Sequence, residues 1–205
     1  DQGREDEAAK ALAAIFQPRP RENVDPDTIL RQLSREPATT RSRMLYFEAV
    51  AAADRGELGL QRQKLEESIR TSPKDVDALI ALHGLADATP LQQQAVRQQI
   101  DAALAQIERE IAAKPDEPNG YNEYAWLAAN TADRTTPPDR CTKATRYSQR
   151  SLELVFDNAS YLDTLAHCHA AEGNFDRAIR AQTLAARYEP HNNTIRRNLA
   201  RFQTL

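Results

Sequence analysis

The stretch from residue 158 to residue 190 decides the fold of this chain. It begins Asn158-Ala-Ser-Tyr-Leu-Asp-Thr-Leu-Ala166 and continues after a few residues with Glu172-Gly-Asn-Phe-Asp-Arg-Ala178. Apolar residues recur every three to four positions on both sides of Gly173, as in two amphipathic helices joined by a short turn. Small residues stand where antiparallel helices would approach closely, at Ala166, Ala178 and Ala185. The stretch therefore predicts a helix pair over 159–171 and 174–188.

Composition extends this prediction to the whole chain. The 205 residues include 34 alanines but only 6 glycines. Since Ala is the best helix former and Gly a poor one, the ratio favours helix. No segment shows sustained alternation of apolar and polar residues, so no strand is predicted. The expected fold class is all-α.

The remaining apolar spacing predicts further helices, with Pro and Gly marking their ends. Gln17-Pro-Arg-Pro20 is expected to end the first helix and Pro37 the second, while Asn192-Asn193 is a plausible cap for the last. The predicted ranges are 5–16, 27–35, 42–54, 57–71, 76–85, 91–113, 121–129, 141–155 and 192–205.

The helices come in pairs, which suggests an internal repeat. Each pair is closed by a turn at Pro73, Pro115, Phe156 or Pro190, and Phe156 stands where the others have proline. The separations are 42, 41 and 34 residues. The last of these is the period of the tetratricopeptide repeat, whose pattern is W-x2-L-G-x2-Y, then A-x3-F, then P.

On these residues the chain resembles the tetratricopeptide repeat (TPR) family. Residue identity departs from the pattern at four places in the best unit, with Leu for Trp, Ala for Gly, His for Tyr and Gln for Phe. The matching positions in that unit are Leu162, Leu165, Ala166, His169, Ala178, Gln182 and Pro190. Two weaker units match the pattern less closely. In the first the matching positions are Tyr121, Tyr124, Ala125, Ala128, Ala144, Ser148 and Ser151. In the second they are Leu45, Ala49, Ala52, Gly56, Leu65, Ser68 and Pro73.

The resemblance covers roughly residues 42–205, is specific over 157–190, and looks bacterial in type. It implies a right-handed α-solenoid of antiparallel helix pairs that serves as a scaffold for protein partners. We expect one domain, 1–205. Its parts are short N-terminal helices (1–41), helix-pair repeats (42–75, 76–117, 118–157 and 158–191) and a C-terminal capping helix (192–205), since terminal helices shield the open ends of such arrays.

Several function classes are disfavoured. The longest apolar runs are a few residues, far short of the roughly 20 that a membrane span needs. A sequence pI near 5.9 lacks the positive field that nucleic-acid binding usually relies on. No phosphate-binding loop or hydrolase motif is present, so we expect no enzyme and no cofactor.

The run His167-Cys168-His169 invites a metal interpretation. Residues two apart on a helix point about 200° apart, so the two histidines cannot easily share one ion, and no metal site is predicted. Cys168 could pair with Cys141 in a disulfide if neighbouring repeats bring their helices together. Two separate buried thiols are the favoured interpretation.

A binding surface is the better candidate. In the TPR fold the first helix of each pair lines the concave face, and its exposed positions fall between the packing positions. In this chain those positions are Asn119, Asn122, Trp126 and Asn130 in one repeat, and Ser160, Asp163 and His167 in the next. Trp126 flanked by Asn amides would make a peptide clamp. The alternative is that Trp126 simply packs between helices.

Other roles remain open. The cationic end could attract an acidic partner, or it could be only a solvated face; it comprises Arg187, His191, Arg196, Arg197 and Arg201. A structural or dimerising spacer is the alternative function, with a possible homodimer formed through the long helix 91–113 or an exposed end. The chain starts at Asp1, so it is read as a processed form or an excised piece, and its compartment is not predicted.

Overall fold

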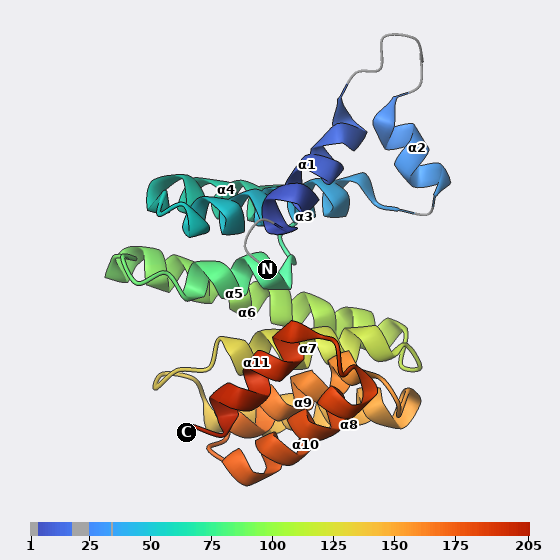
Figure 1. Cartoon of the computed structure of the whole chain (residues 1–205), viewed down its shortest axis with the longest axis vertical. Coiled ribbons are helices and arrows are strands. Elements are labelled where there is room, and N and C mark those ends of the chain that lie inside the picture. The colour runs from blue at the N-terminus through green and yellow to red at the C-terminus, as the bar shows by residue number, and fades with distance from the viewer. Residues whose placement is uncertain (1–3, 18–24, 34) are drawn as a thin grey trace. The chain divides into compact units, whose positions relative to one another are not determined.

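A computed structural model describes residues 4–17, 25–33 and 35–205. Within these residues the chain forms helices and no strand, which confirms the all-α prediction (Figure 1). The helices are α1 (Arg4–Phe16), α2 (Pro26–Gln32), α3 (Pro37–Asp54), α4 (Leu58–Thr71), α5 (Val76–His83), α6 (Pro90–Ala113), α7 (Pro118–Asn130), α8 (Pro138–Leu154), α9 (Ala159–Ala171), α10 (Phe175–Tyr188) and α11 (Asn193–Phe202). None of these helices is long and apolar enough to cross a membrane.

Proline begins helices more often than it ends them. Pro37 was expected to end a helix that runs to residue 35, but α2 ends at Gln32 and Pro37 is the first residue of α3. In the same way Pro118 and Pro138 begin α7 and α8, three residues earlier than predicted. Proline suits this position because its missing N–H would have no partner in the first turn. The break expected at residues 18–20 lies outside the described residues.

The chain divides into two compact units, residues 1–99 and residues 100–205. The expectation of one domain remains a prediction. In the first unit α3 and α4 form a pair with a tight turn between them. Gly56 has a φ of 74° and the N–H of Glu57 donates to the carbonyl of Ala52, so the turn needs the left-handed conformation that glycine adopts easily.

Small residues let α3 and α4 approach closely. The hydroxyls of Ser42 and Ser68 lie 2.8 Å apart, and both side chains are fully buried. Ser42 also donates to Asp75 Oδ2 at 2.6 Å, which links the pair to the start of α5. Apolar positions expected from the repeat pattern fill the rest of this core, namely Leu45, Ala49, Ala52 and Leu65.

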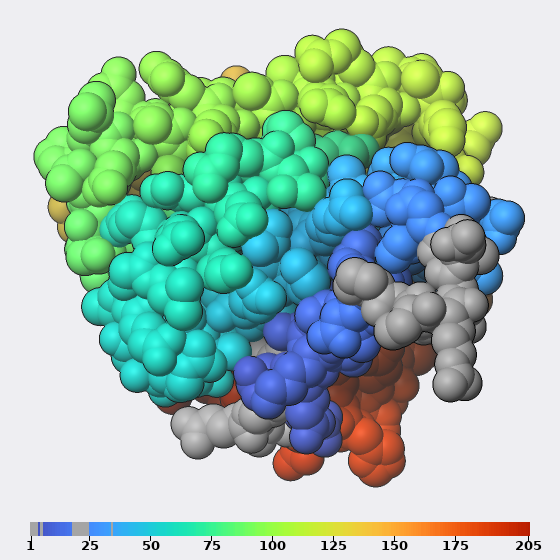
Figure 2. All heavy atoms as spheres, turned by 90° about the horizontal axis from the view of Figure 1, so that it is seen from above, coloured from blue at the N-terminus to red at the C-terminus, as the bar shows by residue number. Residues whose placement is uncertain are grey.

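The N-terminal helices pack on α3. Figure 2 shows the side chains of α1, in dark blue, against those of α3. The Arg41 guanidinium lies over the ring of Phe16, 4.7 Å from its centroid, and donates to Asp27 Oδ1 at 2.6 Å. One arginine of α3 therefore touches both α1 and α2.

In the second unit α7 pairs with α8 and α9 pairs with α10, and α9 packs against both α7 and α8. This is the stacking expected of consecutive repeats. The small positions predicted for close contact are all fully buried, at Ala125, Ala128, Ala144, Ser148, Ser151, Ala166, Ala178 and Ala185. Gly173, with a φ of 76°, closes the turn between α9 and α10 as Gly56 does between α3 and α4.

The turns between pairs share one geometry. Ser72, Val155 and Glu189 follow α4, α8 and α10 with φ/ψ of −139°/95°, −143°/93° and −126°/72°. Two turn residues come next, and an extended N-cap residue then begins the following helix. Phe156 therefore occupies the place that proline takes in the other turns.

Helix α11 covers the end of the last pair (Figure 1). Ile195 packs with Leu162 and Ala185, while Phe202 packs with Ala166 and Ala178. The N-cap Asn192 accepts hydrogen bonds from the backbone N–H groups of Thr194 and Ile195, which fixes the start of the helix. These contacts place α11 as the predicted capping helix.

Candidate functional site

Four of the predicted site residues share one face of α7, because they follow one another at intervals of three or four residues. Asn119 is exposed, while Asn122, Trp126 and Asn130 are half-buried. Asn130 is used locally, since its Nδ2 donates to the carbonyl of Trp126 at 2.9 Å. Asn119 accepts a hydrogen bond of 2.5 Å from the hydroxyl of Tyr161 on α9.

Asn122 has a side-chain hydrogen-bond acceptor that is not used within the described part of the chain. Its Oδ1 is buried and has no hydrogen-bond partner. A buried amide oxygen without a partner costs free energy that a suitably placed N–H donor would recover. Asn122 precedes Trp126 by one helical turn, so the two side chains lie on the same face of α7.

Trp126 does not stand alone on its face. Its ring lies 4.8 Å from that of His167 on α9, at an interplanar angle of 69°, and His167 in turn lies 5.2 Å from the ring of Phe202 on α11. Trp126 and His167 are separated by 41 residues and His167 and Arg201 by 34, which are the repeat separations. Equivalent positions of successive helices therefore meet here: the Trp126 ring contacts His167, and His167 contacts both Arg201 at the equivalent position of α11 and the ring of its neighbour Phe202.

Asp163 and His167 were expected to be exposed on the binding face, but both are buried. The reason is the capping helix. Asp163 Oδ1 accepts from Asn198 Nδ2 of α11 at 3.0 Å and from Gln182 Nε2 of α10 at 2.5 Å. The predicted site is thus divided into an accessible part on α7 and a covered part on α9.

The bonds of His167 define its tautomer. Arg201 carries only donors and its Nη2 lies 3.1 Å from His167 Nε2, so Nε2 accepts. Nδ1 then carries the proton and donates to the carbonyl of Asp163 at 2.9 Å. Burial lowers the pKa of His167, and nearby Arg201 lowers it further, while the charge of Asp163 acts in the opposite direction. With one accepting and one donating nitrogen, the ring in this tautomer is neutral.

Some members of this network were not predicted as site residues. Gln182 had been placed at a packing position and Arg201 in the cationic end, while Asn198 and Phe202 had been given no role in the site. Gln182 Nε2 also donates to the carbonyl of Ile195 at 3.1 Å, which ties α10 to α11. The signal that could have identified Arg201 is its spacing of 34 residues from His167.

The cysteines and His169 lie apart from this face. Cys141 and Cys168 are both free thiols, and Cys168 is buried with its Sγ 3.8 Å from the carbonyl of Ala125. Burial raises the pKa of both thiols, so neither is an activated nucleophile. Burial also lowers the pKa of His169. Across residues 4–17, 25–33 and 35–205, no group of three or more His, Cys, Asp or Glu side chains could hold a metal ion.

No family model matches the sequence, and no curated protein is similar to it. Solved structures are similar to it to different degrees. TTC0263, a thermophilic TPR protein in Thermus thermophilus, is 16% identical over 99% of this chain and 92% of its own, with a TM-score of 0.55. YrrB, a TPR protein with an unusual peptide-binding site, is 13% identical over 98% and 85%, with a TM-score of 0.43. The first similarity shows the fold alone, and in fold this chain is a TPR-type helical-repeat protein, as its residues predicted.

Proposed function

We propose that this chain is a non-catalytic scaffold that binds a protein or peptide partner through the face of its first helices, which is concave in the TPR fold. The accessible part of the site is formed by Asn119, Asn122 and Trp126 on α7. Asp163 and His167 contribute indirectly. The carbonyl of Asp163 accepts a hydrogen bond from His167, and the His167 ring contacts that of Trp126. The role is recognition, and no chemistry is assigned to the site.

The observation that carries this proposal is the setting of Trp126. The only tryptophan of the chain is half-buried, with a ring contact to His167 and with the unpartnered Oδ1 of Asn122 one turn away. A tryptophan held in place on one side is a typical anchor for binding, since little conformational freedom is lost when a partner covers it. The amide supplies direction by accepting a backbone N–H.

The test uses a Trp126→Ala variant and a matched Phe156→Ala control. Phe156 is 76% exposed in the turn after α8. The control therefore also removes an aromatic side chain, but at a position outside the α7 face. Immobilised parent and variant chains are incubated with a lysate of the source organism, and captured proteins are identified by mass spectrometry. We expect partners that Trp126→Ala loses and Phe156→Ala retains.

A direct readout follows from the single tryptophan. Each purified partner is titrated into the parent chain while tryptophan emission is recorded, with a tryptophan-free segment of the partner as ligand. Contact with the indole will shift the emission as the ring is desolvated. Partners retained equally by Trp126→Ala, with no change in emission, would contradict the proposed face.

A second candidate function is a dimerising spacer, the alternative expected from the long helix. Leu91, at the start of α6, is 76% exposed, as an interface residue would be in the separated chain. Light scattering coupled to size exclusion tests it at several concentrations. A dimer that Leu91→Ser converts to a monomer would support this role, and a chain that is monomeric at high concentration would contradict it.

A further inference from the structure

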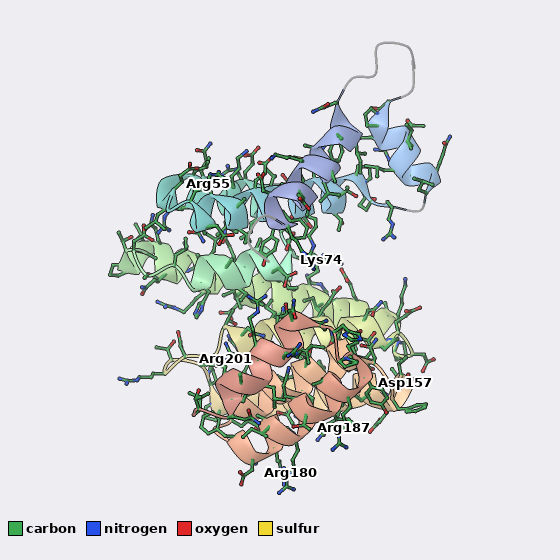
Figure 3. All side chains as sticks on the ribbon, in the orientation of Figure 1. Arg55, Lys74, Asp157, Arg180, Arg187 and Arg201 are labelled. Carbon is green, nitrogen blue, oxygen red and sulfur yellow. The ribbon has the colours of Figure 1, made fainter. Side chains whose placement is uncertain are left out.

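The outward face of α10 carries an unusual mixture of side chains. Three arginines and two apolar residues follow one another at helical spacing and form one stripe, which comprises Arg177, Arg180, Leu184, Arg187 and Tyr188. The opposite side of the helix is the buried one and carries Ala178, Gln182 and Ala185. Figure 3 shows the side chains of Arg180 and Arg187 extending away from the α10 ribbon. We call this stripe the α10 face.

The arginines of the α10 face have no carboxylate partner among the residues that the structure describes. Elsewhere in the same unit cations are paired, as Arg150 is with Glu153 and Arg140 with Asp101, at 2.9 and 2.7 Å. On α10 neither Arg177, Arg180 nor Arg187 makes an ion pair with any described residue. Even Asp176, one turn before Arg180, is not within ion-pair distance of it.

Charge is segregated along the second unit. Residues 100–174 contain seven cationic and twelve acidic residues, a formal charge of −5. Residues 175–205 contain six arginines against Asp176 and Glu189, a formal charge of +4. A chain of net charge −3 therefore ends in a positive segment, in which the three arginines of the α10 face are available to meet an external anion.

The α10 face also offers exposed apolar surface beside its charges. Leu184 is 39% exposed and Tyr188 is 47% exposed, and both lie within one turn of Arg187. An arginine beside an apolar side chain binds a carboxylate in surroundings that a partner can partly desolvate, which strengthens the pair. Leu184 lies between Arg180 and Arg187 on the stripe and Tyr188 follows Arg187, so a partner can make apolar contacts directly beside the charges.

We propose that the α10 face is a docking surface for an acidic protein segment that carries an apolar side chain between its carboxylates. Carboxylates pair with the guanidinium groups of Arg180 and Arg187, and the apolar side chain packs between them on Leu184 and Tyr188. From Arg177 to Tyr188 the helix is about 17 Å long, from a rise of about 1.5 Å per residue, so about three turns of a helical partner would cover it.

Nucleic acid fits this surface less well. The rest of the same unit, residues 100–174, has a formal charge of −5, which disfavours a long polyanion. Bases could stack on Tyr188, but the aliphatic side chain of Leu184 would be left without a role, since nucleic acid is held by charge and by aromatic stacking. The α10 surface is separate from the Trp126 face, which lies on α7, so the two proposals can fail independently.

The experiment measures binding of fluorescein-labelled synthetic peptides by anisotropy. The probe is a 14-residue helical peptide with Glu at every third or fourth position and Leu between, and the comparison peptides replace every Glu with Gln or every Leu with Ser. A labelled single-stranded oligothymidylate of similar length is the nucleic-acid arm. All titrations use the whole chain at low and at moderate salt.

The variants are Arg180→Glu/Arg187→Glu and the control Arg134→Glu/Arg146→Glu. The control alters two exposed arginines of the same unit that make no ion pair with any described residue, and it changes the net charge by the same amount. We expect the first pair to raise the Kd of the acidic peptide by about tenfold or more, as loss of two complementary charges does. The control, and Trp126→Ala, should change it by less than about threefold.

The apolar part is tested by Leu184→Ser/Tyr188→Ser, which should weaken binding several-fold while the Gln peptide stays unbound. Circular dichroism checks that every variant remains folded, as expected for exposed positions. The proposal is overturned if the control weakens binding as much as the α10 pair, if the Leu-to-Ser peptide binds as tightly as the probe, or if the oligothymidylate binds more tightly than the peptide.

Discussion

Helices α7 and α9 occupy equivalent places in two successive repeats, 41 residues apart, but the exposure of their equivalent side chains differs. On α7 the positions Asn122 and Trp126 remain half-exposed, whereas on α9 the equivalent Asp163 and His167 are buried. The two helices pack on their own partners in the same way, through small residues such as Ala125 and Ala166. The difference comes from α11, which contacts α9 through Asn198, Arg201 and Phe202.

The comparison teaches that exposure in this array is decided by the neighbouring helix. A first helix uses its small and apolar side chains to pack on its own pair, and its polar side chains are left for whatever comes next. At α9 the next element is the end cap, so Asp163 and His167 become internal hydrogen-bonding groups. At α7 the equivalent residues, Asn122 and Trp126, stay half-exposed, and these are the residues that we propose contact a partner. The predictions below test this division.

The largest effect is expected from removing the anchor of α11. Phe202 is almost fully buried against Ala166 and Ala178, and its ring also lies beside His167. Phe202→Ala should lower the free energy of unfolding by about 3 kcal/mol, as a buried Phe-to-Ala change does. Urea unfolding followed by the emission of Trp126, which lies in the same unit, measures it.

Gln203→Ala is the control for this change, since Gln203 is the exposed neighbour of Phe202. Hydrogen exchange adds a local readout: amides of α11 should exchange faster in Phe202→Ala while those of α8 do not. Equal unfolding free energies for the two variants would mean that α11 is not held by Phe202, and the burial of Asp163 and His167 would need another cause.

A smaller effect is expected where α9 meets α10. Ala166 has no exposed surface and contacts both Ala178 and Phe202, so a longer side chain has no room. Ala166→Leu should destabilise the unit by about 1–3 kcal/mol through overpacking. Ala200→Leu, at an exposed position of α11, is the matched control and should change stability by less than about 0.5 kcal/mol. An unchanged unfolding curve for Ala166→Leu would show that the repeat register is wrong.

The helices were predictable because their signals are local. Apolar spacing identified each helix, and Gly173 marked a turn that needs a positive φ. The boundaries were less accurate where proline was involved. Pro37 was read as the end of one helix although it is the beginning of the next, since a proline is compatible with both a break and a first turn.

The site was predictable only in part, because burial of a polar residue depends on elements far along the chain. The spacing placed Asn122 and Trp126 correctly on one face of α7. The same rule placed Asp163 and His167 on α9, but no local signal shows that Asn198 and Arg201, more than thirty residues later, would bond to them. The 34-residue spacing of His167 and Arg201, which is the repeat period, was a usable sign, because equivalent positions of stacked repeats are neighbours.

The smallest effect concerns the proton on His167. Its pKa is lowered in the folded chain, whereas in the unfolded chain it takes the ordinary value of about 6.5. As the pH falls below about 6.5 the unfolded state binds a proton that the folded state resists, so stability is full above this pH and decreases below it. A proton on Nε2 would face the donors of Arg201, so uptake requires the contact between α9 and α11 to open.

His167→Gln should weaken this pH dependence, because glutamine can still accept from Arg201 but does not titrate. The free energy of unfolding is measured by urea at pH 7.5 and pH 5.5, and the decrease on acidification is compared between chains. His191→Gln, at an exposed histidine, should keep the decrease of the parent. His169 also has a lowered pKa, so part of the decrease should persist in His167→Gln. If that variant loses as much stability on acidification as the parent, then protonation of His167 does not weaken the contact between α9 and α11. That contact would then depend on Phe202 and Asp163 alone.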